Sequence, residues 1–226
     1  VMIDGRSIYT QTFSGTYWDF NDVNISDIER IEVIRGPGAT LWGANATNGI
    51  INIITKTAAD TLGGDAVVSG SAINEEVAVR YGFGDEERAA RIYFKHRRLP
   101  ELEDSFMSTA NETWAMDQLG MRLDWHLDDT QTLTLQGDLV NAEYEDFVKY
   151  RRGANILGRY TKEHSEDSSS SIQLYYWGYV NRDGGSAEDG SDLAFDGLRE
   201  RVDRPIGPPS PLQSVRPPSM RMTRSF

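Results

Sequence analysis

Hydrophobic and polar residues alternate with a period of two along most of the chain after residue 60. In residues 88–98, Ile92 and Phe94 lie on one side of the predicted strand, and Arg91 and Lys95 lie on the other. A period of two is typical of a strand with one face in apolar surroundings and the other in water. The same alternation predicts about seven strands, near residues 65–73, 76–83, 88–98, 113–127, 131–141, 153–163 and 169–181.

The connections between the predicted strands differ in length. Residues 84–87, 128–130 and 164–168 form short connections, whereas residues 99–112 and 142–152 form long ones. Short turns at one end and long loops at the other are typical of a membrane β-barrel, and so are aromatic residues near the strand ends. A soluble β-sandwich also has alternating strands, so the pattern alone leaves that alternative open.

The first sixty residues follow a different pattern. Residues 28–35 alternate and predict a half-buried strand, preceded by a single helical turn that Ser26 or Asn24 would cap. Residues 36–38, Gly-Pro-Gly, end this strand, and about one helical turn is expected after them. The β-branched residues 50–55 then predict a second strand. This segment therefore predicts a small α+β unit ahead of the alternating strands.

Composition removes several classes of function. The chain has 226 residues, no cysteine, 35 acidic and 23 basic residues, and a formal charge of −12. Disulfides and thiolate metal sites are therefore excluded, and the charge argues against a nucleic-acid partner. The turn at residues 36–38 lacks the third glycine of a dinucleotide-binding motif, and Pro37 has no N–H for a phosphate. The most apolar run, residues 50–55, is far shorter than the roughly 18 residues of a membrane-spanning helix.

No catalytic, metal or cofactor site is predicted. His96, His126 and His164 are scattered, and no recognisable motif supplies a Ser or Cys partner. Residues 183–192 are rich in carboxylates that a calcium ion would accept, but their spacing differs from an EF-hand and favours a solvated loop. We therefore expect a protein that is not an enzyme and holds no cofactor.

The alternation fails after Asn181. From residue 204 onward the chain holds four arginines, no acidic residue and six of its eight prolines. Proline cannot donate a hydrogen bond to a neighbouring strand. The sequence therefore predicts that residues 182–226 form an irregular tail, either disordered or produced by a shifted reading frame.

Four blocks near the N-terminus resemble a known family. They are residues 1–6 (VMIDGR), 27–37 (DIERIEVIRGP), 41–46 (LWGANA) and 48–56 (NGIINIITK), and they stand in the order and spacing of the plug domain of TonB-dependent outer-membrane receptors. Trp42 stands where many members carry Tyr. Four ordered blocks are a far more specific signal than any one short motif.

The resemblance implies a mainly β fold in three parts. Residues 1–60 would be the C-terminal half of an α+β plug domain, and residues 61–181 about seven N-terminal strands of a large antiparallel transmembrane β-barrel. The tail from residue 182 would follow them. Seven strands leave unpaired edges, so we expect this fragment to be inactive alone.

The resemblance also implies a function. Members take up a scarce ligand, such as a ferric siderophore or another iron chelate, through the outer membrane of a Gram-negative bacterium. Their partners are the TonB energy-transducing complex, reached through a TonB box absent from this chain, and outer-membrane lipid. The alternatives are a plug-type ligand-binding or signalling protein and a non-functional gene remnant.

Two groups of candidate site residues follow from the same resemblance. Phe13, Tyr17 and Trp18 match a loop that rises to the plug apex and touches ligand in siderophore receptors. Aromatic rings there would stack on a chelate, or they would instead pack in the plug core or against the barrel wall. Arg35 matches an arginine that pairs with barrel carboxylates and locks the plug.

Overall fold

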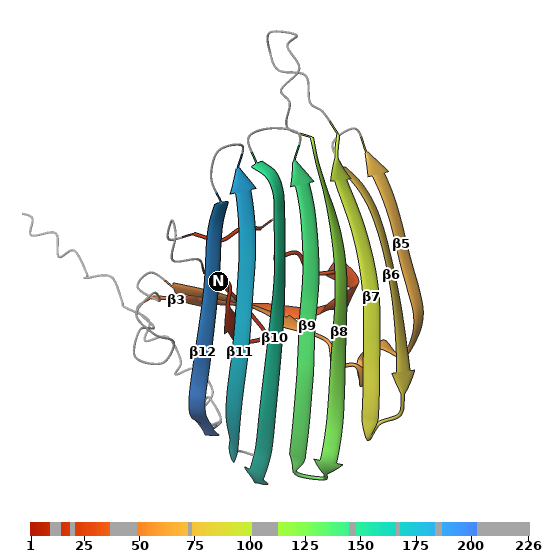
Figure 1. The fold of residues 1–226 in the computed structure, drawn as a ribbon. Helices are drawn as coiled ribbons and strands as arrows, with labels where there is room; N and C mark the ends of the chain where they lie inside the picture. Colours follow the sequence, from red (N-terminus) through yellow and green to blue (C-terminus); the bar gives the residue numbers. More distant parts are fainter. Residues whose placement is uncertain are drawn as a thin grey trace, which may run out of the picture.

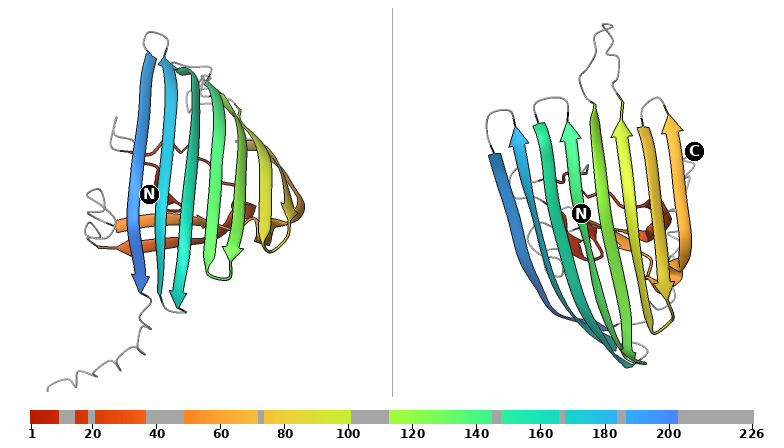
Figure 2. Two further views of the ribbon diagram at one scale, coloured as in Figure 1. Left: turned by 60° about the horizontal axis from the view of Figure 1, so that its bottom comes forward. Right: turned by 45° about the vertical axis from the view of Figure 1, so that its right-hand side comes forward.

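Two β-sheets make up the structure, and the smaller one lies against the inner face of the larger, curved one (Figures 1 and 2). The computed structural model describes residues 1–9, 15–18, 21–36, 49–71, 74–100, 113–144, 148–165, 168–183 and 187–202. Within these residues, no helix is long and apolar enough to cross a membrane.

The small sheet has four strands in the order β2-β1-β4-β3. Strand β4 pairs parallel with β1 and antiparallel with β3. A single 3-10 turn, η1 (Ile25–Asp27), precedes β3 as the sequence predicts, but Asn24 at its N-cap position makes no capping hydrogen bond with its side chain, and Ser26 lies inside the turn. The expected helical turn after residue 38 lies outside the described residues. The strands are β1 (Met2–Ile3), β2 (Arg6–Ser7), β3 (Ile28–Arg35) and β4 (Gly49–Thr55).

The large sheet has eight antiparallel strands, each paired with its neighbours in the chain. A second 3-10 turn, η2 (Ala59–Thr61), leads into it from β4. All seven predicted strands are present. The strands are β5 (Gly63–Ser71), β6 (Asn74–Gly84), β7 (Arg88–Leu99), β8 (Trp114–Asp128), β9 (Gln131–Tyr144), β10 (Val148–Ser165), β11 (Ser168–Asp183) and β12 (Ala187–Val202).

Two sequence predictions about this sheet are wrong. Residues 187–202, expected to belong to an irregular tail, form β12 and pair with β11 over most of their length. Backbone hydrogen bonds to β11 supply this pairing without an apolar alternation. The expected long loop at residues 142–152 is also shorter, because β9 continues to Tyr144 and β10 begins at Val148. Residues 203–226 lie outside the described residues.

The two faces of the large sheet are opposite in character. On the outer face, Leu119 is 53% exposed and Leu139 is 58% exposed, whereas Lys95 on the inner face is only 2% exposed. A soluble sandwich would bury its apolar faces, so this arrangement contradicts that alternative. On β8 the apolar outer residues run from Leu119 to Leu127, about 26 Å along the strand. These nine residues match the roughly 9–11 residues with which a tilted strand crosses the apolar core of a membrane.

Candidate functional site

The inner face of β8 and β9 holds the small sheet through a buried carboxylate, that of Asp4. Asp4 lies in the β1–β2 turn at a positive φ of 49°. Its carboxylate accepts hydrogen bonds from Thr55 N at 2.9 Å and Thr55 Oγ1 at 2.8 Å, which tie the turn to β4. Gln136 Nε2 on β9 donates to the same group at 2.9 Å, and Arg122 Nη1 on β8 lies 3.8 Å away. Asp4 therefore joins both sheets.

Arg122 pairs more closely with a second buried carboxylate, Asp124 on the same strand. Arg122 Nε donates to Asp124 Oδ2 at 2.7 Å, and Arg122 Nη1 donates to Thr55 Oγ1 at 2.9 Å. Asp124 also accepts the backbone N–H of Ala58 at 2.7 Å and the hydroxyl of Thr134 at 2.7 Å. The large sheet thereby holds both the last residue of β4, Thr55, and the segment after it, at Ala58.

Three further ion pairs connect the first sixty residues with the large sheet in the same polarity, and one of them joins Arg97 Nη1 to the Asp22 carboxylate at 3.5 Å. Lys95 Nζ lies 2.9 Å from the carboxylate of Asp22 and 3.4 Å from that of Glu76 on β6. Arg80 on β6 pairs with Asp27 of η1. In each crossing pair the acid belongs to the first sixty residues and the base to the large sheet. Lys95 and Asp27 are almost fully buried, so each charge depends on its own ion-pair partners for solvation.

A polar cavity of about 50 Å³ lies between the two sheets beside these pairs. Among the described residues, Asn24 Oδ1, Arg91 Nε and Gln118 Oε1 line this region, are buried and have no hydrogen-bond partner. A polar cavity of this size has room for ordered water, which would satisfy such atoms. Burial lowers the pKa of the Arg6 guanidinium at this cavity, while the carboxylates of Asp138 and Asp4 raise it. The interface between the small sheet and the large sheet is therefore made mainly of polar and ion-paired side chains.

Aromatic rings and an arginine form a second contact between the first sixty residues and the large sheet. The guanidinium of Arg151 on β10 lies 3.9 Å from the ring centre of Tyr17 and 5.5 Å from that of Tyr144. Tyr17 also meets Tyr179 edge-on at 5.6 Å, and Tyr179 stacks on Trp177 at 5.5 Å. This set, which we call the aromatic cluster, combines a buried cation with the faces of several rings.

The predicted site residues differ in their exposure and in their contacts. Tyr17 is half-buried against the wall of the large sheet, which was one of its two expected roles, whereas Trp18 is 55% exposed. Phe13 lies outside the described residues. Arg35 ends β3 and is exposed, and it forms no ion pair with a described carboxylate. Its role as a lock stays a prediction.

Sequence reasoning missed the residues that hold the two sheets together. Asp4, Arg122 and Arg151 were not singled out, although Arg122 lies on the polar side of a predicted strand. A charged residue on the inner face of a barrel strand is the available signal, because it must meet either lumen water or a partner. Within the described residues, no cluster of three His, Asp or Glu side chains could hold a metal ion.

Comparisons with known proteins agree with this architecture. The family model of the TonB-dependent receptor plug domain matches residues 1–50. The ferric enterobactin receptor of Pseudomonas aeruginosa is 27% identical over 208 residues, which cover 73% of this chain and 28% of that receptor. The vitamin B12 transporter BtuB of Photobacterium profundum is 46% identical over 55 residues, 24% of this chain and 9% of that transporter.

Solved structures show the same fold. The copper transporter OprC superposes with a TM-score of 0.64 at 16% identity, covering 81% of this chain and 30% of OprC. The siderophore receptor PirA from Pseudomonas aeruginosa superposes with a TM-score of 0.59 at 20% identity, covering 85% of this chain and 34% of PirA. The chain thus spans about a third of the length of these structures.

A small sheet docked on the polar inner face of a curved sheet whose outer face is apolar defines a plugged membrane barrel. The plug-domain match over residues 1–50, the relatives and the superposed structures together support a fragment of a TonB-dependent receptor. Its small sheet is part of the plug, and its large sheet is part of the barrel wall.

Proposed function

We propose that a full-length receptor carrying this segment takes up a small ligand, such as a ferric siderophore, across the outer membrane of a Gram-negative bacterium. The TonB complex would supply the energy by acting on the plug. Support comes from the relatives, which include a ferric enterobactin receptor and a siderophore receptor of Pseudomonas aeruginosa. The apolar outer face of the wall supports the location.

The contact between Arg151 and Tyr17, with guanidinium and ring 3.9 Å apart, carries the proposal. It joins the plug segment expected to touch ligand to the wall at a site that offers positive charge and aromatic faces. An anionic chelate with aromatic groups would find both an ionic partner and stacking surfaces there. A ligand that competes for Arg151 would also weaken a contact between plug and wall.

Transport in this proposal needs only binding and conformational change. Ligand shifts the plug toward a released arrangement to the extent that it binds that arrangement more tightly. The ion pairs of Asp4, Asp22 and Asp27 with the wall oppose release, because separating a buried pair exposes charges to poor solvation. External energy is therefore needed to move the plug, which is the role given to TonB.

The test uses a full-length receptor that carries this segment, with ferric enterobactin as the probe. Tyr17→Ala and Arg151→Gln should each weaken binding by about tenfold, the size expected from losing one stacking or charge-assisted contact. The matched control is Arg98→Gln, which alters an exposed arginine on the outer face. Uptake should disappear in a TonB-deficient strain while binding persists. Equal uptake with and without TonB would refute the proposal.

A further inference from the structure

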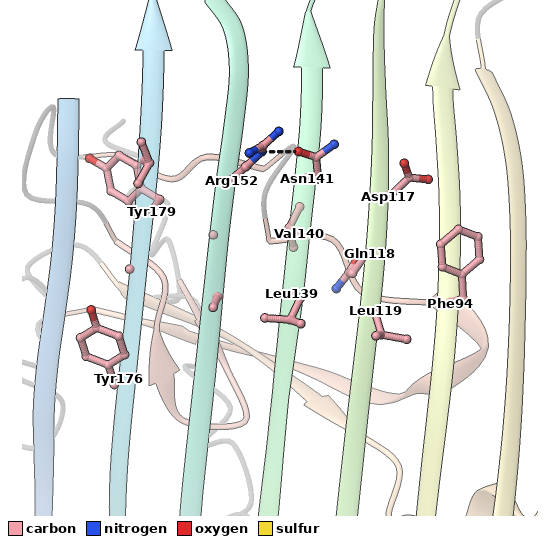
Figure 3. A pocket seen from close by; sticks show the side chains of 14 residues that line it. Phe94, Asp117, Gln118, Leu119, Leu139, Val140, Asn141, Arg152, Tyr176 and Tyr179 are labelled. Atoms are coloured by element: carbon pink, nitrogen blue, oxygen red, sulfur yellow. Dashed lines mark hydrogen bonds between the residues drawn. The ribbon is translucent and has the colours of Figure 1, made fainter. Parts of the chain in front are cut away.

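A depression of about 770 Å³ lies on the outer face of the wall, across strands β7 to β11 (Figure 3). Its floor is made by small residues. Ala154 on β10 stands opposite Gly178 on β11 and Leu139 on β9 in the cross-strand register. The missing side-chain volume at Ala154 and Gly178 leaves a gap beside Leu139 and Tyr176, which are both exposed. The depression is therefore an apolar groove on a face that lies in the membrane.

Polar side chains border this groove at one end. Asp117, Asn141 and Arg152 lie at one level, with Leu119 and Leu139 on the other side of the boundary (Figure 3). In the register, Asn141 stands opposite both Asp117 and Arg152. Along β8 and β9, these polar residues lie two positions, or about 7 Å, from Leu119 and Leu139. The border is therefore placed where lipid headgroups would meet the acyl region.

Among the described residues of this border, Arg152 is the cation without an acidic partner. Its Nε donates to Asn141 Oδ1 at 2.9 Å, and its guanidinium lies 4.7 Å from the ring centre of Tyr150. It forms no ion pair with a carboxylate of the described residues. By contrast, Asp117 is bonded to His96 Nδ1 at 2.8 Å. Nε is thus occupied, while the outer edge of the guanidinium keeps N–H donors that suit a phosphate.

The neighbouring acids restrict where an anion would sit. Glu143 lies beyond Asn141 toward the strand end and accepts from Asn141 Nδ2 at 3.3 Å. Asp117 lies on the β8 side of Asn141. Both carboxylates stand toward β8 and β9, so an anion would approach Arg152 from the β11 side. Val180, which stands opposite Arg152 in the register, and Gly178 border the groove there.

We propose that this groove is a binding site for an anionic membrane lipid, with its phosphate on Arg152 and one acyl chain over Ala154 and Gly178. The site lies toward the end of the sheet where the longest connection, between Leu99 and Trp114, joins β7 to β8. Long connections of bacterial barrels face outward, so the lipid belongs to the outer leaflet. This proposal is independent of the transported ligand, because it concerns the opposite face of the wall.

The alternative is that lipid contacts this surface only as a solvent, without preference. The two cases differ in selectivity and in their response to substitution. A built site discriminates between headgroups of different net charge on the same acyl chains. Lipid that only solvates the surface exchanges freely, and its retention should not change when one exposed arginine is replaced.

The experiment measures lipids retained by a full-length receptor carrying this segment, by native mass spectrometry after mixing with equal amounts of phosphatidylglycerol and phosphatidylcholine of identical acyl chains. The unsubstituted receptor should retain phosphatidylglycerol preferentially. Arg152→Gln should reduce this preference about tenfold, as expected from the loss of a charge-assisted contact. Ala154→Leu should reduce retention of both lipids by filling the groove.

Arg98→Gln is the matched control, because Arg98 is an exposed arginine of the outer face that is already paired with Glu75 at 3.8 Å. It should leave the preference unchanged. Equal retention of the two lipids by the unsubstituted receptor would overturn the proposal, as would equal losses in Arg152→Gln and Arg98→Gln. Neither readout requires ferric enterobactin or TonB, so failure here leaves the proposed uptake function standing.

Discussion

Asp4 of the plug and Arg122 of the wall face each other across the boundary between the two sheets, with Asp4 Oδ2 3.8 Å from Arg122 Nη1. Their side chains are 4% and 8% exposed, so water solvates neither charge well. Arg122 Nε also forms an ion pair with Asp124 Oδ2 at 2.7 Å, so one arginine pairs with a carboxylate of the plug and a carboxylate of the wall. Hydrogen bonds from Thr55 and Gln136 complete the solvation of Asp4. We regard this group as the main attachment of the plug.

Replacing Arg122 with alanine should therefore loosen the plug strongly. The substitution removes the guanidinium that pairs with both Asp4 and Asp124, and removing one partner of a buried ion pair typically costs about 3–5 kcal/mol. The measurement is hydrogen exchange at the amides of Thr55 and Ala58, which donate to these two carboxylates at 2.9 and 2.7 Å. Exchange at both amides should accelerate in a full-length receptor that carries this segment.

Arg30→Ala provides the comparison for that experiment. Arg30 pairs with Glu29 at 2.6 Å and Glu32 at 2.9 Å, but all three side chains are exposed. Exposed pairs of this kind contribute about 0–1 kcal/mol, so exchange at Thr55 should hardly change. If Arg122→Ala left the two amides as protected as Arg30→Ala does, the attachment assigned to Arg122 would be wrong.

Gly120 on β8 should not tolerate a side chain. It stands opposite Tyr93 in the register, and a Cβ at Gly120 would overlap the Tyr93 ring and the Asp138 carboxylate. Tyr93 donates to Asp138, so Gly120→Ala would displace a partly buried hydrogen-bonded pair. We expect a loss of about 1–3 kcal/mol in the free energy of unfolding.

Thermal unfolding of a full-length receptor carrying this segment, in detergent, checks this prediction. Gly70→Ala is the control, because an added Cβ at Gly70 meets no atom within 4 Å. The control should keep the unfolding temperature of the unsubstituted protein within a degree or two, on the scale that small surface changes produce. Equal unfolding temperatures for both variants would show that Tyr93 moves aside without cost.

Arg35→Ala tests the lock that the family resemblance assigns to this residue. Arg35 is exposed at the end of β3, on the edge of the small sheet away from β1. If it pairs with barrel carboxylates in a full-length receptor, its removal should raise permeability to an antibiotic too large for porins. If permeability is unchanged in Arg35→Ala but rises in Arg122→Ala, the plug is locked by the contacts between Asp4 and Arg122 instead.

The strands of the wall were predictable because one physical constraint repeats along them. Each strand must place apolar residues toward lipid and polar residues toward the lumen, so the period of two appears in the sequence, as in residues 88–98. The plug segment was predictable for another reason. Its strands at 28–35 and 50–55 carry β-branched residues between glycine turns, and its four ordered blocks identify the family.

The parts that sequence reasoning missed depend on pairing between distant residues. Strand β12 is held by its ladder with β11, and a ladder leaves no pattern in the sequence of one strand. The contact of Arg151 with Tyr17 requires two elements that are distant in the sequence to meet. The alternation predicts on which side of its strand a residue lies, but not which residue it contacts there. Alternation therefore predicts that Arg122 points inward, but it does not predict which plug carboxylate Arg122 meets.

The 226-residue chain alone should fail to insert stably into a membrane. In the described residues, β5 and β12 each pair on one side only, and each unpaired backbone group costs several kcal/mol in lipid. Eight strands suffice to close the smallest bacterial barrels, but the interior of such a barrel is filled by its own side chains. The plug occupies that space here, because Asp4 and Tyr17 contact the inner face.

Refolding the 226-residue chain into phosphatidylcholine vesicles tests this directly. We expect full digestion by added protease and no ion conductance, whereas a full-length receptor carrying the segment should leave a protease-resistant barrel under the same conditions. A variant without residues 1–60 removes the plug and so distinguishes the two causes of failure. If it inserts while the longer chain does not, the plug prevents closure. A protease-resistant, conducting species from the 226-residue chain itself would show that the edges can pair around the plug.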